Sequence, residues 1–275
     1  MGSLSHHINE LHAAEAFNRQ APVFDSLYEA DPIIQYKRHR VRKQILSLLP
    51  PSADMLELNC GSGTDAIYFA GEGHRVHATD ISAGMLSVLE EKISTSQLKN
   101  QISMERCSFT ELPLLENKGP FDLIYSNFGG LNCTGEIHEV LQALPTLLKP
   151  GGTVTLVIIS RFCLWETMML FRGKFKTAFR RFFSGAGRKA MVEGHSFRCW
   201  YYAPRQVRRL MQKDFELLSL EGLCTLVPPS YLEGFAQKHP RLYHFLLARE
   251  NKWKNRWPWK AIGDYYVISF RKKIS

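Results

Sequence analysis

Short apolar runs alternate with amphipathic segments along the middle of the chain. The apolar runs have strand length, and the segments between them repeat apolar residues every three or four positions, as helices packed on one face do. This pattern predicts strands at 55–59, 75–79, 102–107, 121–125 and 153–159, and helices at about 65–71, 83–94 and 136–148. Strands that alternate with helices indicate a mostly parallel sheet covered on both faces. Right-handed crossovers make this a doubly wound α/β fold.

The regions on either side of this core have other patterns. Two helical runs precede it and end at Pro50 and Pro51. Aromatic and cationic residues follow it without a clear strand, over a stretch too long for a plain connection, so we predict an inserted cap that is helical in its first half. A helix from Pro204, a strand, a second helix and a last strand complete the sheet. We divide the chain into an N-terminal helical segment (1–50), a core (51–160), the cap (161–203) and the C-terminal part of the sheet (204–275).

Composition excludes several classes of protein. The 275 residues are 45% hydrophobic and 22% charged, as in an ordinary globular protein. The longest apolar run contains Arg161 and Glu166, which would be costly in a bilayer, and the N-terminus lacks the pattern of a signal peptide. The six cysteines are scattered singly, without zinc-ligand spacing. We therefore expect a cytoplasmic protein with reduced thiols and no metal.

The net charge of +9 is concentrated in segments where Lys and Arg alternate with aromatic residues. These segments are "YKRHRVRK" (36–43), "FRGKFKTAFRRFF" (171–183) and "NKWKNRWPWK" (251–260). Solvated helix faces are the simplest interpretation. The alternatives are an acidic substrate, weak contact with an anionic membrane, or RNA; we expect no DNA partner. A monomer and a homodimer are both compatible with the sequence.

The turn after the first predicted strand indicates a nucleotide-like ligand. "MLELNCGSGTDA" (55–66) is a strand, a glycine turn and a helix start, and the next strand ends at Asp80. Either a nicotinamide dinucleotide or S-adenosylmethionine (SAM) fits this arrangement, because each presents ribose hydroxyls to such an acid. Glu57 favours SAM, since a carboxylate here attracts an ammonium group and repels a pyrophosphate. A helix N-cap is the alternative role for Asp80.

Four motifs in order make the chain resemble the class I SAM-dependent methyltransferases. They are "LELNCGSGTDA", "HATDISAGML", "GPFDLIYSNFGGLN" and "LLKPGGTVTLVI". The resemblance covers 51–160. It implies a seven-stranded sheet whose last strand is antiparallel, with the strands at 216–220 and 264–270 forming the terminal pair. It also implies SAM as cofactor and S-adenosylhomocysteine (SAH) as product.

The resemblance assigns parts of the cofactor to residues of this chain. Glu57, Gly61 and Gly63 fall where the family holds the methionine end, and Asp80 falls on the ribose acid. Asn59 replaces the usual first glycine of the turn, and Ser108 stands where many members have an acid that bonds the adenine amine. The Ser108 hydroxyl or the Phe109 amide would then recognise adenine. The predicted cofactor residues are Glu57, Asn59, Gly61, Gly63, Asp80, Ile81, Met85, Ser108, Phe109, Asn127 and Phe128.

Methyl transfer requires alignment more than acid–base catalysis, so the catalytic residues are less well marked. A base would assist a hydroxyl nucleophile, and we consider His195, Tyr201 and Tyr202 for that role, with Arg161 holding an anionic substrate group. His138 is a further candidate, although capping or solvent contact suits it better. The cap and the N-terminal helices are expected to cover the substrate site.

These observations favour a small-molecule O-, N- or C-methyltransferase. Methylation of RNA or protein is the alternative, but the chain has "SNFG" (126–129) where enzymes that methylate planar amines carry an "NPPY"-like tetrapeptide. A non-catalytic SAM-binding protein is the third possibility, suggested by Asn59 and Ser108.

Overall fold

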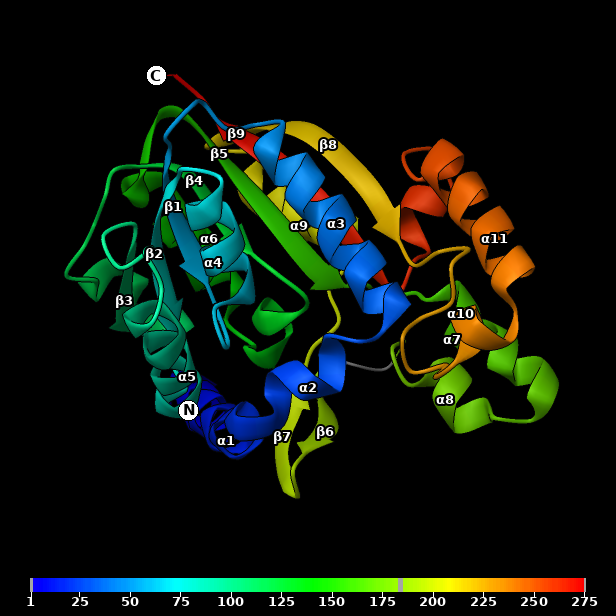
Figure 1. The fold of residues 1–275 in the computed structure, drawn as a ribbon. Helices are drawn as coiled ribbons and strands as arrows, with labels where there is room; N and C mark the ends of the chain where they lie inside the picture. Colours follow the sequence, from blue (N-terminus) through cyan, green and yellow to red (C-terminus); the bar gives the residue numbers. More distant parts are fainter. Residues whose placement is uncertain (1, 183–184, 275) are drawn as a thin grey trace.

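A computed structural model describes residues 2–182 and 185–274 of the chain, so Met1, Phe183, Ser184 and Ser275 of the predicted segments lie outside the described residues. Its centre is a seven-stranded sheet with the order β3-β2-β1-β4-β5-β9-β8 (Figure 1). β9 runs antiparallel to both of its neighbours, and the other pairings within β1–β5 are parallel. The strands are β1 (Asp54–Leu58), β2 (Arg75–Asp80), β3 (Ile102–Arg106), β4 (Phe121–Ser126), β5 (Leu148–Ile159), β8 (Phe215–Leu223) and β9 (Tyr265–Lys272). The predicted doubly wound α/β fold with an antiparallel last strand is confirmed.

Helices cover both faces of the sheet because each presents an apolar stripe to it. One core cluster joins α3, α4 and α5 to the sheet, and a second joins α6 and α9 to its opposite face. In α6 the buried residues recur every three or four positions, as Ile137, Val140, Leu141, Leu144 and Leu147. The helices are α1 (Gly2–Gln20), α2 (Phe24–Tyr28), α3 (Pro32–Leu46), α4 (Thr64–Gly71), α5 (Ala83–Ser94), α6 (Ile137–Leu147), α7 (Leu164–Met168), α8 (Phe175–Phe179), α9 (Pro204–Met211), α10 (Phe235–Lys238) and α11 (Pro240–Trp253). Short 3-10 turns are η1 (Ala21–Val23), η2 (Phe109–Leu114), η3 (Gly130–Cys133), η4 (Met169–Arg172) and η5 (Trp259–Ala261).

Local capping explains where several helices start. The Asp31 side chain accepts hydrogen bonds from the amides of Ile33 and Ile34, and Pro32 occupies the first turn of α3. The Ser82 hydroxyl accepts from the amide of Met85 at the start of α5. Ser82, not Asp80, is therefore the N-cap of α5, so the alternative role for Asp80 is wrong.

The cap differs from its prediction in its second half. Its first half is helical, with α7, η4 and α8, but residues 188–199 form a hairpin of β6 (Arg188–Val192) and β7 (His195–Cys199). The hairpin packs on α1 through Phe197, which contacts Ala13 and Ala16. In Figure 1, α7 and α8 lie near α10, away from the hairpin. The prediction of no strand was wrong, because this strand pair is short and its support comes from a helix far away in sequence.

Buried ion pairs tie the terminal segments to the sheet. Arg40 of α3 bonds Glu250 of α11 at 3.0 Å and Glu221 of β8 at 2.8 Å. The Glu250 carboxylate also accepts hydrogen bonds from the amides of 224–227. All six cysteines are free thiols, as predicted. Within the described residues, no helix is long and apolar enough to cross a bilayer.

Candidate functional site

A cavity of about 170 Å³ lies where the carboxyl ends of β1, β2 and β4 meet the N-terminal helices. In open parallel sheets this edge is where ligands bind, because the loops after neighbouring strands converge there. Most of the predicted cofactor residues contribute to the wall, together with residues of the segments before β1. The wall consists of Ala13, Phe17, Phe24, Arg38, Glu57, Asn59, Cys60, Gly61, Ser62, Thr64, Asp65, Asp80, Ile81, Met85, Phe109, Asn127, Phe128, Gly129, Gly130 and Cys133.

The glycine turn after β1 needs its glycines for two different reasons. Gly61 has a φ of 55° and Gly63 a φ of 76°, in the left-handed region that disfavours most side chains. A Cβ at Gly63 would also lie 2.2 Å from a methyl carbon of Leu89 in α5. The turn is locked to β2, since the Gly61 amide donates to the Asp80 carboxylate at 2.8 Å. Backbone shape and close packing together hold this turn against the cavity.

Asn59 occupies the position of the usual first glycine, and the structure accommodates it. Its φ of 53° is left-handed, which Asn tolerates better than most residues. Its side chain donates to the Asn127 carbonyl and accepts from the Ser126 hydroxyl, so it joins the end of β1 to the end of β4. A Cβ on Gly130 would lie 2.1 Å from the Asn59 side chain. Gly130 thus leaves the space that Asn59 fills.

Two acidic residues beside the turn have opposite environments. Asp65 is neutralised by Arg38 and Arg42, each at 2.8 Å, and accepts a further hydrogen bond from Asn127. Glu57 is only 2% exposed, and its Oε2 has no hydrogen-bond partner among the described residues. Burial, reinforced by the charge of Asp65, raises the pKa of Glu57 well above its ordinary value.

Unpartnered acceptors of this kind fit an ammonium group. The Asn127 side-chain oxygen is likewise buried and without a partner within the described chain, and both residues line the cavity. An ammonium group would satisfy both oxygens, and the Arg38 guanidinium on the same wall suits a neighbouring carboxylate. SAM carries both groups at its methionine end, so the residues present fit that cofactor.

Asp80 lies at the end of β2 with both carboxylate oxygens directed by backbone amides. Oδ2 accepts from Gly61 and Oδ1 accepts from Ser82 at 2.9 Å. Burial raises the pKa of this carboxyl, although the two amides oppose the shift. Each oxygen keeps a further lone pair, so Asp80 can still accept hydrogen bonds from two ribose hydroxyls. Ile81 and Met85, which follow it, supply an apolar wall.

Ser108 and Phe109 follow β3 and differ in their position relative to the cavity. Phe109 lines the cavity, whereas Ser108 is absent from the wall among the described residues. The Ser108 hydroxyl caps η2 in a capping box with Glu111, and it also donates to the Glu10 carboxylate of α1. Recognition of adenine by Ser108 or Phe109 stays a prediction.

Asn127 and Phe128 follow β4 as predicted, and both line the cavity. Phe128 has a φ of 47°, and its ring lies under the cations of Lys37 and Arg38, 5.7 and 5.3 Å from its centroid. The strained backbone turns this ring toward the N-terminal helices. The Phe128 ring therefore contributes an apolar surface to the cavity wall.

The four predicted catalytic residues do not meet at this cavity. His195 opens β7 and pairs in register with Val192. The Tyr201 ring lies under Arg181, at 5.2 Å, and the Tyr202 hydroxyl donates to the Thr134 carbonyl at 2.5 Å. Burial raises the pKa of both tyrosines, which keeps their hydroxyls protonated and so unable to accept a proton. Arg161 is exposed and lines a separate cavity of about 850 Å³ between α9 and β8.

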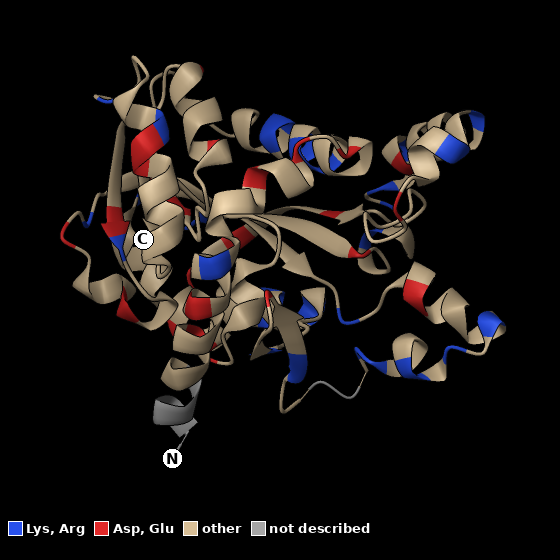
Figure 2. Ribbon diagram, turned by 60° about the horizontal axis from the view of Figure 1, so that its bottom comes forward, with Lys and Arg blue, Asp and Glu red and all other residues tan. Residues whose placement is uncertain are grey.

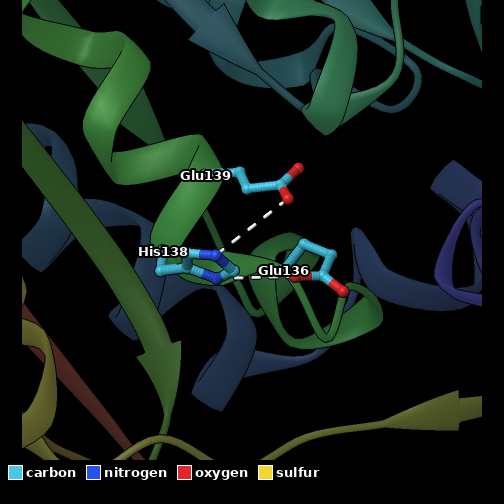
Figure 3. Close-up of side chains that lie close together, drawn as sticks. All are labelled: Glu136, His138 and Glu139. Carbon is cyan, nitrogen blue, oxygen red and sulfur yellow. Dashed lines mark ion pairs between the residues drawn. The ribbon is translucent and has the colours of Figure 1, made fainter. Parts of the chain in front are cut away.

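His138 also lies away from the cavity, in a surface cluster with two acids (Figure 3). Its ring nitrogens lie 3.4 Å from Glu136 and 4.0 Å from Glu139. The three groups have the residue types of a metal site, but the ring is half exposed and the ion pairs account for its position. This agrees with the solvent role favoured by the sequence.

Sequence reasoning missed the wall residues that come from outside the strand ends. Phe17 and Phe24 are contributed by the first two helical segments, Arg38 by α3, and Cys133 by η3. The apolar face of the first helical run was a signal for the aromatic rings. No local signal indicated Arg38, because its role depends on how α3 crosses the start of α4.

Comparisons with known proteins agree with this geometry. Residues 55–152 match a family model described as a methyltransferase domain. A demethylmenaquinone methyltransferase of Bacillus cereus (strain B4264) is 32% identical over 146 residues, which cover 51% of this chain and 58% of that relative. The chain thus spans little more than half the length of the curated relatives it matches.

Two solved structures share the fold over almost the whole chain. The DhpI–SAH complex has a TM-score of 0.60 at 13% identity and covers 98% of this chain and 99% of its own. A 1,6-didemethyltoxoflavin-N1-methyltransferase of Burkholderia thailandensis, with SAH bound, has a TM-score of 0.56 at 15% identity and covers 98% and 90%. At these identities the likeness concerns the fold alone. The family match over 55–152, the motifs and the sheet order together show that the chain has the fold of the class I SAM-dependent methyltransferases and resembles them in sequence over its core.

Proposed function

We propose that the protein binds SAM in the cavity at the glycine turn and transfers its methyl group to a small organic molecule. The observation that carries this proposal is the Glu57 carboxylate, which is buried in the wall of this cavity and leaves its Oε2 without a hydrogen-bond partner among the described residues. A buried carboxylate oxygen without a partner is costly to keep in a folded protein unless a ligand satisfies it. The family match supports the same chemistry.

The residues of the cavity would bind and align rather than exchange protons. When bound, SAM supplies a methyl group on a sulfonium, which an electron-rich atom attacks in line. Glu57, Asn127 and Arg38 would orient the methionine end, and Asp80 the ribose. The rings of Phe17, Phe24 and Phe128 would exclude water from the wall. Since no predicted base lines this cavity within the described residues, alignment carries the proposed catalysis.

The proposed acceptor is an apolar or acidic small molecule. The curated relative is named for a quinone substrate and one structural neighbour for a toxoflavin precursor, and both are small organic molecules. Methylation of RNA or protein remains the second candidate, because the basic aromatic segments suit it. A SAM-binding protein without catalysis would bind SAH and methylate nothing.

Two measurements test the proposed function. Calorimetric titration should show SAH binding to the purified protein, and NAD should not compete. Incubation with cell-extract metabolites and isotopically labelled SAM, followed by mass spectrometry, should then reveal a labelled small molecule. SAH binding with label found only in RNA or protein would favour the second candidate. NAD binding without SAH binding would overturn the proposal.

We propose that the cap supports α1 rather than covering the cavity directly. The N-terminal helices line the cavity, whereas no cap residue within the described chain does. The β6–β7 hairpin instead packs behind α1, where Asn9 bonds the Arg198 backbone. Phe197→Ala should therefore loosen α1 and slow methyl transfer, with Met191→Ala on an exposed part of the hairpin as control. Equal turnover by both variants would contradict this role.

We also propose that α7–α8 and the segment before β9 form a weak membrane-facing surface. Phe171 is 88% exposed and Trp257 81%, and both lie beside Lys and Arg, which Figure 2 marks in blue along these parts of the chain. Exposed aromatic rings beside cations suit a membrane interface. Co-sedimentation with anionic vesicles, lost at high salt and absent with neutral vesicles, is the expected result. A salt-sensitive gel shift with structured RNA, without vesicle binding, would favour RNA instead.

A further inference from the structure

One face of α1 lies against the cofactor cavity and carries a carboxylate. Ala13 and Phe17 line the cavity, and Glu10 lies one turn before Ala13 on the same face, because helical residues three or four apart are neighbours. The helix is held at both ends of this face. Asn9 donates to the Cys133 carbonyl at 2.8 Å, and Asn18 accepts from the Gly84 amide at 2.8 Å. The position of Glu10 is therefore set by contacts on either side of it.

Only one of the two oxygens of the Glu10 carboxylate has a hydrogen-bond partner within the described residues. Glu10 is 2% exposed, and its Oε2 accepts the hydroxyl of Ser108. Its Oε1 has no hydrogen-bond partner within the described residues. Phe109, next to Ser108, lines the cavity, and so does Cys133, whose thiol pKa is raised mainly by burial and in part by the charge of Glu10. An unpartnered acceptor thus lies buried at the border of the cavity, beside the loop after β3.

This is the loop where the family resemblance expects an acid for the adenine amine and where this chain has Ser108 instead. We propose that Glu10 supplies the missing acid: its Oε1 accepts a hydrogen bond from the exocyclic amine of the cofactor's adenine, while Ser108 orients it by donating to Oε2. The inference rests on the proposed function, because it needs SAM or SAH in the cavity. Glu10 lies outside 55–152, so the cofactor site extends beyond the part of the chain that the family model matches.

The alternative is a latch, by which we mean that the hydrogen bond between Ser108 and Glu10 only fixes the position of α1. Such a latch would have different consequences from a direct hydrogen bond to the ligand. A latch would affect every ligand of the cavity alike, since it would act through the position of α1. A direct hydrogen bond depends on the polarity of the ligand group that faces it. The adenine amine donates, whereas the carbonyl of S-inosylhomocysteine, which replaces that amine, accepts and would be repelled by a carboxylate.

Glu10→Gln separates the two cases with little change of shape. If the amide oxygen keeps the bond from Ser108, the amide nitrogen takes the place of Oε1 and presents donors to the ligand. The variant should then lose affinity for SAH and gain affinity for S-inosylhomocysteine. Glu15→Gln is the matched control, because Glu15 lies on the exposed face of the same helix and pairs only with Arg19 among the described contacts.

Calorimetry with both ligands is the test, with thermal denaturation to verify folding. We expect the wild type and Glu15→Gln to prefer SAH, and Glu10→Gln to reduce that preference about 10- to 100-fold, the size of a hydrogen bond to a charged acceptor. An equal loss for both ligands would show a latch and overturn the inference. Equal affinity of the wild type for SAH and S-inosylhomocysteine would also overturn the inference, and this measurement needs no variant. A wild type that binds neither would overturn the proposed function, and this inference with it.

Discussion

Two buried glutamates show how differently this protein treats its acids. Glu250, on the C-terminal side of the sheet, bonds Arg40 and accepts hydrogen bonds from four successive backbone amides. Glu57, at the carboxyl end of β1, is equally buried but leaves one oxygen without a partner within the described residues. The first region is complete as folded. The second is built with unused bonding capacity, which is what a ligand site requires.

The largest expected effect is the loss of stability in Glu250→Ala. The substitution leaves Arg40 and the four amides without their acceptor, so the free energy of unfolding should fall by about 3 to 5 kcal/mol. Urea denaturation would measure this change, with the exposed Glu15→Ala as control. A loss below that of the control would mean that the two glutamates do not differ as described.

Glu57→Gln should have the opposite effect on stability and a cost in binding. Folding raises the pKa of Glu57 above its ordinary value near 4.5, so the carboxylate destabilises the fold increasingly as pH rises above that value. The amide variant escapes this penalty and should be the more stable protein at pH 8 but not at pH 4. It should bind SAH less tightly by about 1.5 to 3 kcal/mol, the value of a hydrogen bond to a charged group.

The affinity of the wild type for SAH should follow the same titration. An ammonium ligand favours the ionised carboxylate, so affinity should rise with pH below the raised pKa of Glu57 and level off above it. Calorimetry across this range should show that dependence in the wild type and a flatter one in Glu57→Gln. Parallel curves would exclude Glu57 from the ligand site.

Asp80→Ala tests an acid that is intermediate between Glu250 and Glu57. Each Asp80 oxygen accepts a hydrogen bond from one backbone amide and can still accept another from a ligand. Loss of the ribose contacts should weaken SAH binding by about 1.5 to 3 kcal/mol. Asp54→Ala, at the other end of the neighbouring strand, is a suitable control because Asp54 pairs with Arg75 on the surface. Unchanged affinity in a folded Asp80→Ala protein would remove Asp80 from the site.

The smallest expected effect concerns the packing of the turn. Gly130→Ala should lower the free energy of unfolding by about 1 to 2 kcal/mol, because its methyl group overlaps the Asn59 side chain. In an Asn59→Gly background the same change should cost much less. A double-mutant cycle by urea denaturation measures this coupling. Additive effects would mean that the two residues do not share the space.

Much of the fold was readable in the pattern because its elements are local. Helix 83–94 was predicted at its observed bounds, and the two terminal strands were paired as found. The β6–β7 hairpin was missed, since Phe197 gains its apolar partners from α1. The start of β5 was placed at 153, although the strand begins at Leu148, where the sequence predicted the end of a helix.

The sequence alone determined the chemistry at the strand ends of the site. Glu57 and the glycines belong to the motif at the turn after β1, and Asp80 belongs to the next motif at the end of β2, so local spacing places this acid beside that turn. Only the tertiary structure decided which residues close that turn. Glu10, Phe17 and Arg38 come from helices whose docking depends on long-range contacts, such as those of Asn18 with α5 and Arg40 with α11. Periodicity reports which face of a helix is apolar, but not the element that the face meets, so the docking of these helices was decided by the tertiary structure.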